Sequence, residues 1–168
     1  MRRPVLALVA ALAVPAAALA QDQGPGAAGG APTGLAASFS FGGGAELGLE
    51  KGKAGVLEME AAVGYEIGTT GIRPEMGAAF GLAPDSHVAL RPGLRWTLPG
   101  FPIQLRAAVD ASNARGATFG FRWLLVGAAG ELRLTSLLGL FAEVDTGAPL
   151  SSDAGLPLLV RAGASFRF

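Results

Sequence analysis

Apolar and non-apolar residues alternate with a period of two over most of the chain, from residue 35 to its last residue. Between Leu35 and Leu49 the odd positions hold leucine, phenylalanine, alanine and one glycine, whereas the even positions hold small residues and Glu46. Successive side chains of a β-strand point to opposite faces, so this period predicts strands with one apolar face. Helical periodicity is missing, and we therefore expect an all-β fold.

Turn-forming stretches rich in glycine, proline, threonine and serine divide the alternating region into eight segments. In the sixth segment the phase of Phe119 and Phe121 does not match that of Leu124, which predicts a β-bulge near Trp123. Two prolines lie on apolar faces, and because proline donates no backbone hydrogen bond they predict further bulges or displaced strand ends. The expected strands are 35–49, 56–67, 72–82, 87–98, 102–111, 117–134, 138–146 and 157–168, with prolines Pro74 and Pro92.

The distribution of charge decides between a soluble β-sandwich and a membrane barrel, because both show this alternation. Apart from Arg122, no predicted apolar face carries a charge, although the chain has 13 basic and 13 acidic residues. The opposite faces combine these charges with glycine, alanine and serine, which suits a crowded barrel interior. Aromatic residues near the strand ends are typical of the interfacial girdles of membrane barrels. They are Phe39, Phe41, Tyr65, Trp96, Phe119, Phe121, Phe166 and Phe168.

These features predict a closed, antiparallel, eight-stranded transmembrane β-barrel over residues 34–168. Closure is required because lipid leaves no partner for an unpaired backbone group. Charged residues make up 15% of the chain, well below the roughly 25% of soluble domains. If the chain enters from the periplasm, turns near 68–71, 99–101 and 135–137 are periplasmic. The loops near 51–55, 83–86, 112–116 and 147–156 then face outward.

The first 20 residues have the features of a cleaved signal peptide. Arg2 and Arg3 precede an apolar stretch, and Ala18-Leu19-Ala20 matches an A-x-A cleavage site. The alternative, a membrane anchor, needs about 20 apolar residues, more than residues 5–20 provide. Residues 21–33 are expected to form a flexible periplasmic leader. Their G-x-G-x-x-G spacing follows no strand, so it does not indicate a dinucleotide site.

Composition excludes several classes of function. The chain has no cysteine and one histidine, which excludes disulfides, cysteine-ligated zinc, a thiol nucleophile and a site with several histidines. Balanced charge argues against a nucleic-acid partner. We therefore expect no cofactor and no metal ion.

The last strand carries the most specific motif. Arg161, Gly163, Phe166 and Phe168 form a pattern of a polar residue, a glycine and two alternating aromatic residues, the second of which is terminal. It resembles the C-terminal sorting and folding signal of bacterial outer-membrane β-barrels. Residues 34–168 resemble the small eight-stranded family that includes the OmpX-like proteins and the OmpA membrane domain. The resemblance implies a place in the bacterial outer membrane among lipid and lipopolysaccharide, with the barrel-assembly machinery as a partner of the last strand.

The interior of an eight-stranded barrel is just wide enough for its side chains to fill it. Interleaved acids and arginines on the inward face predict an ion-pair network that plugs the lumen, whereas the inward glycines and alanines leave a narrow conduit as the alternative. The acids of the first hairpin, which include Glu50, would form an outer acidic vestibule able to hold a cation if solvated. The predicted network is Glu46, Glu58, Glu60, Arg91, Arg95, Arg106 and Arg161.

Catalysis has one candidate cluster, Asp85-Ser86-His87. Adjacent strand residues point to opposite faces, so Ser86 and His87 are not expected to converge, and His87 is interpreted as a surface-loop residue. The catalytic arrangement of barrels that deacylate lipid A resembles His-x-Ser. In this chain residues 87–89 are His-Val-Ala, so the serine is missing. We therefore expect a structural envelope protein without catalysis, with a passive channel as the alternative and a lipid A-modifying enzyme third. Basic loop residues Lys51, Lys53 and Arg115 would lie near lipopolysaccharide phosphates.

Overall fold

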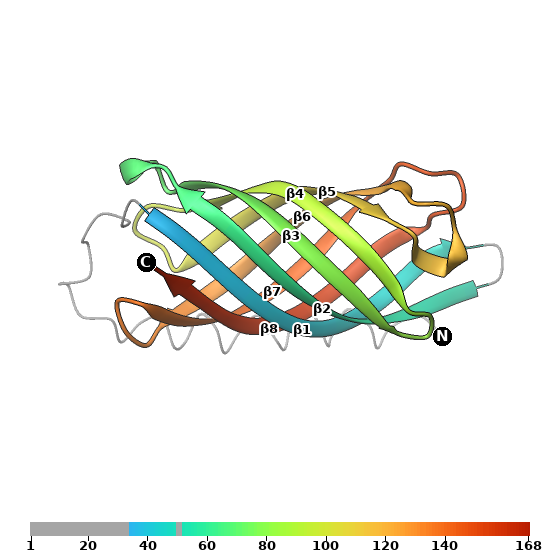
Figure 1. The fold of residues 1–168 in the computed structure, drawn as a ribbon, viewed down its shortest axis with the longest axis horizontal. Coiled ribbons are helices and arrows are strands. Elements are labelled where there is room, and N and C mark those ends of the chain that lie inside the picture. Colours follow the sequence, from blue (N-terminus) through green and yellow to red (C-terminus); the bar gives the residue numbers. More distant parts are fainter. Residues whose placement is uncertain (1–33, 50–51) are drawn as a thin grey trace.

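The computed structural model describes residues 34–49 and 52–168, and the predicted signal peptide and leader lie outside them. These residues form one closed barrel in which every strand is antiparallel to its neighbours (Figure 1). No helix among them is long and apolar enough to cross a membrane. The strands are β1 (Gly34–Leu49), β2 (Gly52–Glu66), β3 (Ile72–Ala83), β4 (His87–Thr97), β5 (Ile103–Ser112), β6 (Gly120–Arg133), β7 (Leu138–Pro149) and β8 (Leu156–Arg167).

The barrel closes where the last strand pairs with the first. The β1–β8 ladder runs from Ala36, opposite Arg167, to Leu47, opposite Leu156. Beyond it, the backbone N–H of Phe168 donates to the carbonyl oxygen of Leu35 at 2.9 Å. Closure leaves neither strand with an unpaired edge along this seam, which is the condition for a sheet to reside in lipid.

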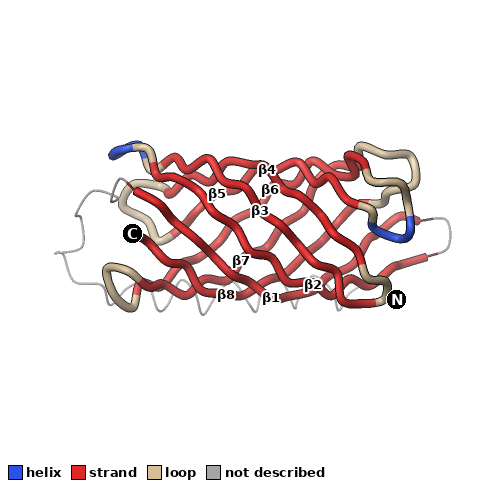
Figure 2. The backbone as a smooth tube through the Cα atoms, viewed as in Figure 1, coloured by secondary structure: helices blue, strands red, loops and turns tan. Residues whose placement is uncertain are grey.

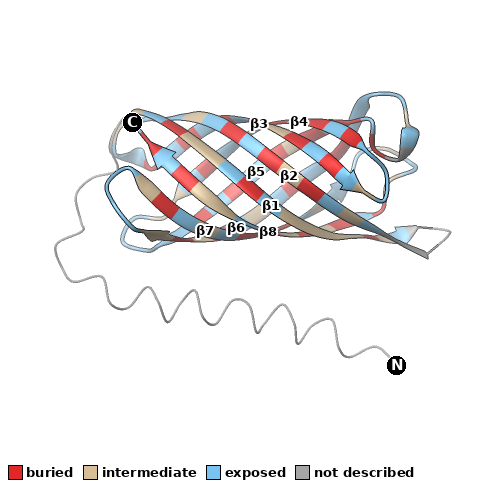
Figure 3. Cartoon of the chain, turned by 60° about the horizontal axis from the view of Figure 1, so that its bottom comes forward, coloured by how far each residue is buried: buried red, intermediate tan, exposed pale blue. Residues whose placement is uncertain are grey.

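Side chains alternate between a polar interior and an apolar exterior. Buried and exposed residues succeed one another along β3 and β4, and Figure 3 shows the resulting bands around the barrel. Arg91 and Glu58 are at most 1% exposed, whereas the outward Val63 is 61% exposed. A soluble protein buries apolar side chains, so this reversed distribution matches a barrel surrounded by lipid. The predicted fold class is confirmed.

Some strand boundaries differ from the prediction. β2 begins at Gly52, so the turn predicted over 51–55 is wrong for residues 52–55, because pairing between β1 and β2 continues to Leu49 and Gly52. β6 begins at Gly120 rather than at 117, and β7 extends to Pro149. The first hairpin therefore extends further than the sequence pattern indicates.

The predicted bulge in the sixth strand is confirmed. Asp110 pairs with Trp123 and the next residue, Ala111, pairs with Phe121, which leaves Arg122 as the additional residue. Arg122 and Trp123 are consequently both buried, while Phe121 and Leu124 on either side are exposed. This bulge brings a charge and an indole into the barrel side by side.

The two prolines do not cause bulges. Pro74 pairs with Leu94, and Pro92 with Met76, without any shift of register between β3 and β4. The β2–β3 ladder ends instead at Glu75, and the β4–β5 ladder has no pair at residues 91 and 92. Each proline lacks a donor, so the ladder on its other side is interrupted while the strand continues.

The two ends of the barrel differ in their connections. The end that holds the start of β1 and the end of β8 carries three turns, 67–71, 98–102 and 134–137, one of which contains the short helix η2 (Gly68–Thr70) (Figure 2). None of these turns contains a charged residue. The opposite end carries the β1–β2 hairpin and the loops 84–86, 113–119 and 150–155, with the short helix η3 (Ala114–Gly116). We call this opposite end the mouth.

The first prediction concerns the apolar exterior. Val126 points outward near the middle of β6, 47% exposed, and Leu137 lies 60% exposed in a turn at one end. Val126→Arg should destabilise the protein refolded in lipid vesicles by about 2–4 kcal/mol, and Leu137→Arg by no more than about 1 kcal/mol, because the cost of a charge falls towards the interface. Urea unfolding followed by tryptophan fluorescence measures both. Equal costs at the two positions would contradict the membrane placement.

Candidate functional site: the lumen

The middle of the lumen is organised around Arg91, which β4 directs inward. Its Nη1 lies 2.6 Å from Glu58 Oε1 and 2.7 Å from Glu60 Oε2, both on β2. Its Nε donates to Asp110 on β5 at 2.8 Å. Arg91 thus has three carboxylate partners on the two strands that flank β3 and β4, and it is 1% exposed.

Two further arginines extend this cluster across the barrel. Arg106 on β5 lies 2.5 Å from Glu60 and 3.1 Å from Glu143 on β7. Arg161 on β8 contacts Glu60 as well, and it donates to Glu143 at 2.6 Å and to Asp145. Glu60 therefore accepts charge-assisted hydrogen bonds from three arginines on three strands. These bonds link opposite walls of the barrel through side chains alone.

The cluster continues towards the end of the barrel that holds the start of β1 and the end of β8. Arg95 lies 2.5 Å from Glu143 and 3.1 Å from Glu75, and it donates to Gln104 at 3.3 Å. Gln104 donates to Glu131 at 2.5 Å, and Arg167 joins Glu131 at 2.7 Å and Glu66 at 3.3 Å. We call this connected set the lumen network: Glu58, Glu60, Glu66, Arg73, Glu75, Arg91, Arg95, Gln104, Arg106, Asp110, Glu131, Glu143, Asp145, Arg161, Ser165 and Arg167.

Glycines on the inner face make room for these side chains. A Cβ on Gly127 would collide with the Asp145 carboxylate, and one on Gly77 would lie 2.9 Å from Glu60 Oε1. Gly77 and Gly127 therefore leave no open conduit, because the neighbouring carboxylates occupy the space beside them.

A second, separate group of polar residues lies at the mouth. Arg122, turned inward by the bulge, lies 3.1 Å from Glu46 and 2.9 Å from Asp153 in the loop 150–155. The backbone N–H of Gly155 donates to Glu46 at 2.7 Å, and Trp123 Nε1 donates to the Gly155 carbonyl at 2.9 Å. These contacts hold the loop against the barrel wall. We call Glu46, Arg122, Trp123, Asp153 and Gly155 the mouth clasp.

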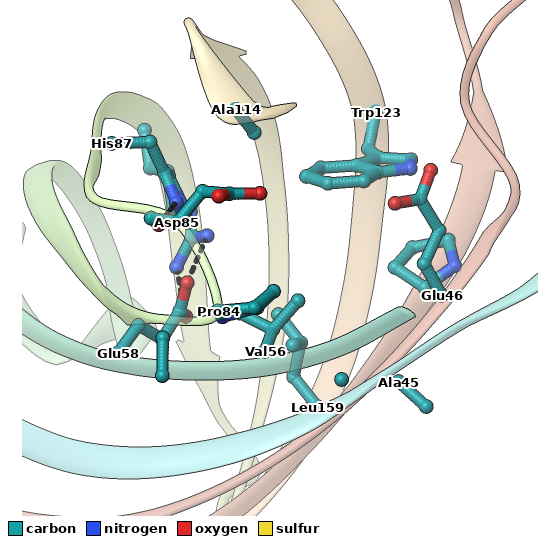
Figure 4. Close-up of a pocket in the computed structure, with 14 residues that line it drawn as sticks. Ala45, Glu46, Val56, Glu58, Pro84, Asp85, His87, Ala114, Trp123 and Leu159 are labelled. Atoms are coloured by element: carbon teal, nitrogen blue, oxygen red, sulfur yellow. Dashed lines mark hydrogen bonds and ion pairs between the residues drawn. The ribbon is translucent and has the colours of Figure 1, made fainter. Parts of the chain in front are cut away.

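A cavity of about 50 Å³ separates the mouth clasp from the lumen network, which is room for a few water molecules. Its floor is the Glu58–Arg91 ion pair, and its walls come from six strands and η3 (Figure 4). We call it the mouth cavity. The lining residues are Ala45, Glu46, Gly55, Val56, Glu58, Ala83, Pro84, Asp85, His87, Arg91, Ala114, Trp123, Pro157 and Leu159.

The structure brings most of the predicted network residues together. Six of them, Glu58, Glu60, Arg91, Arg95, Arg106 and Arg161, belong to the lumen network. Glu46 belongs to the mouth clasp instead, because its partner is Arg122. The sequence pattern assigns Arg122 to an apolar face, as the one charged exception. The bulge predicted near Trp123 indicates that Arg122 could point inward, because a bulge reverses the face to which the neighbouring side chains point.

The acidic vestibule is not formed as expected. Glu58 and Glu60 are buried and paired with arginines, so they do not present free charge to an entering cation. Glu50 lies outside the described residues. Among those described, no group of three acidic, histidine or cysteine side chains is arranged to hold a metal ion.

The candidate catalytic cluster does not assemble either. Ser86 is exposed and His87 is buried, so the two side chains point apart as expected. The interpretation of His87 as a surface-loop residue is wrong, because it begins β4 and its ring points into the mouth cavity. Gly81 lies opposite on β3, and a Cβ there would collide with the imidazole ring. The ring Nδ1 lies 3.2 Å from the Asp85 carbonyl oxygen.

The C-terminal motif is divided between the two faces of β8. Arg161 points inward into the lumen network, whereas Phe166 and Phe168 point outward and are 40% and 74% exposed. Gly163 lies opposite Ser40 on β1, where a Cβ would collide with the Phe39 carbonyl oxygen. The role of these residues as a sorting signal stays a prediction.

No protein-family model matches the sequence, and no curated protein aligns with it significantly. Solved structures do match the fold. Neisserial surface protein A superposes with a TM-score of 0.55 at 13% identity, covering 80% of this chain and 96% of that one. The N-terminal β-barrel domain of Pseudomonas aeruginosa OprF gives 0.53 at 13% identity, covering 81% and 98%. Ail of Yersinia pestis, solved with sucrose octasulfate, gives 0.54 at 12% identity, covering 82% and 100%.

The chain therefore folds as a small eight-stranded outer-membrane β-barrel, and the predicted resemblance to this group is confirmed at the level of fold. The same neighbours support the predicted location in a bacterial outer membrane.

The second prediction concerns the lumen network. Arg91→Met should lower the free energy of unfolding by about 3–5 kcal/mol, because it leaves Glu58, Glu60 and Asp110 without this cation in a buried site. Adding Glu58→Met should restore part of the loss. Arg133→Met, at a half-buried position near the end of β6, is the control and should change stability little. A loss at Arg91 no larger than at Arg133 would contradict a role of the network in stability.

Proposed function

We propose that this protein is an integral outer-membrane protein with a structural role in the cell envelope, and that it catalyses no reaction. The observation that carries the proposal is the lumen network. Glu60 and Glu143 are each held by three arginines from several strands, so the cross-section of the barrel is filled by paired charges. Such a barrel adds a rigid, sealed element to a membrane.

The faces of the barrel support the proposed placement in the membrane. In this placement the apolar exterior contacts lipid, the uncharged turns, the start of β1 and the end of β8 face the periplasm, and the mouth faces outward. Lys53 belongs to β2 and Arg115 to η3, and Lys51 lies outside the described residues; these three basic residues are proposed to meet lipopolysaccharide phosphates. The barrel-assembly machinery would engage β8 through Gly163, Phe166 and Phe168.

The two alternative functions, a passive channel and a lipid A-modifying enzyme, would each require a different arrangement of side chains. A passive channel requires ion pairs such as Glu60–Arg161 to separate, and each separation exposes uncompensated charge at a cost of several kcal/mol. A lipid A-modifying enzyme requires a nucleophile next to a base, and Ser86 and His87 point apart.

Electrical recording separates the sealed barrel from the channel. The purified protein inserted in planar lipid bilayers should give no stable unitary conductance steps. Glu60→Ala combined with Arg161→Ala removes two central side chains and should produce such steps. Val126→Ala combined with Leu94→Ala, which shortens two lipid-facing residues, is the matched control and should stay silent. Regular steps in the unmodified protein would favour the channel.

The envelope role is tested in the source bacterium. Deletion of the gene should increase uptake of a hydrophobic dye and sensitivity to detergent, and the unmodified protein should restore both. Lipid A should have the same mass spectrum with and without the gene. Unchanged permeability would contradict the structural role, and an altered lipid A spectrum would favour the enzyme.

A further inference from the structure

The mouth cavity is not needed to seal the barrel, because the lumen network already fills the cross-section below it. It opens at the mouth, and its walls combine two kinds of surface. One wall carries Asp85 and His87 from the start of β4 and the turn before it. The facing wall carries the Trp123 indole, and Val56 and Leu159 lie below it (Figure 4).

Asp85 is the charged group of the cavity lining that is available to bind a ligand. Its side chain makes no hydrogen bond or ion pair with the described residues, whereas Glu58 is bound by Arg91 and Glu46 by Arg122. Figure 4 shows the Asp85 carboxylate directed towards the middle of the cavity, facing Trp123. An exposed carboxylate that faces an aromatic wall is free to pair with a bound cation.

His87 adds a second acceptor beside it. A carbonyl oxygen accepts but cannot donate, so the 3.2 Å contact between His87 Nδ1 and the Asp85 carbonyl oxygen matches the tautomer that carries its proton on Nδ1. The Nε2 atom then accepts hydrogen bonds, and it has no partner among the described residues. The ring is 9% exposed and lines the cavity, so this acceptor is held in place by packing over Gly81.

The charge of the lining favours a cation. Of the carboxylates that line the cavity, Glu58 is paired with Arg91 and Glu46 with Arg122, so Asp85 supplies the charge that remains for a cation. The remaining surface is apolar, from the Trp123 indole, Val56, Leu159 and two prolines, Pro84 and Pro157. A ligand that matches both parts has an ammonium group at one end and a small apolar group at the other.

We propose that the mouth cavity is a binding site for a small organic ammonium ion with an apolar or aromatic substituent. The ammonium group pairs with the Asp85 carboxylate and donates to His87 Nε2. The enclosed volume of about 50 Å³ is too small for a whole aromatic ring, so the substituent enters in part and extends along Trp123 into the open mouth. The Glu58–Arg91 pair closes the floor, so the ligand is held at the mouth and does not pass through the lumen.

Trp123 provides the readout. The chain has two tryptophans, and Trp96 is exposed on the outer face of β4, so Trp96→Phe leaves the indole in the cavity wall as the only one. In this variant, refolded in detergent micelles at pH 7, benzylamine should change the emission along a saturable one-site curve, with a dissociation constant on the order of 1 mM for so small a ligand. Benzyl alcohol and benzoate have a similar shape without the positive charge, and they should bind at least fivefold more weakly.

Two substitutions locate the ligand. Asp85→Asn should weaken benzylamine about fivefold to tenfold without affecting the fold, because Asp85 is exposed and unpaired. Ala114→Leu fills the cavity from η3 and should abolish the saturable change. Ala128→Leu, on the lipid face of β6, adds the same side chain elsewhere and should leave binding unchanged.

The proposal is overturned if benzylamine produces no saturable change in the Trp96→Phe protein. It is overturned equally if benzyl alcohol binds as well as benzylamine and Asp85→Asn has no effect, since the cavity would then take up apolar molecules without regard to charge. Binding that persists in folded Ala114→Leu protein would place the ligand in the micelle or on another surface.

Discussion

The pairing of β8 with β1 is the constraint on which the other features depend. Lipid supplies no partner for a free strand edge, so the sheet must close on itself. Closing eight strands fixes the width of the interior at roughly the length of two facing side chains. The inward positions must therefore be filled by residues that satisfy each other. In this chain most of them are acids and arginines, joined by Gln104 and Ser165.

Burial of so many charges requires that they be paired, because a single ion in a low-dielectric interior costs several kcal/mol even after relaxation. The arginines meet this requirement by contacting several carboxylates each. Arg106 reaches Glu60, Glu75 and Glu143, which lie on three different strands. The fork of donors on a guanidinium suits such bridging better than the single ammonium of lysine. No lysine is found in the lumen network.

The mouth has a different organisation because one bulge interrupts the alternation. By adding Arg122 to β6, the bulge brings a cation to Glu46 and an indole to Gly155. The loop 150–155 is thereby tied across part of the opening. Small side chains such as Ala45, Ala83 and Ala114 line the same level of the barrel, so a cavity remains where the lumen network ends.

Period two alone allowed the eight strands, their two faces and most inward charges to be predicted, because the pleat assigns each residue to a face independently of its neighbours in space. Partners across the lumen could not be predicted in this way. Glu46 and Gly155 lie 109 positions apart, and their contact depends on the curvature of the closed sheet. The prediction that His87 lies in a surface loop is wrong because a residue at a strand end can belong either to the loop or to the barrel wall. Its pairing with Gly81 places His87 in the wall, and this pairing cannot be derived from the alternation alone.

Electrophoresis in dodecyl sulfate tests the central claim, closure of the barrel, most directly. The protein extracted from membranes is compared before and after boiling. A closed, fully paired barrel resists the detergent at room temperature, so the unboiled sample should migrate as a distinct compact species that boiling converts to the unfolded position. Identical mobility of the two samples, with the protein recovered in the soluble periplasmic fraction, would contradict closure in lipid and favour a β-sandwich whose apolar faces pack against each other.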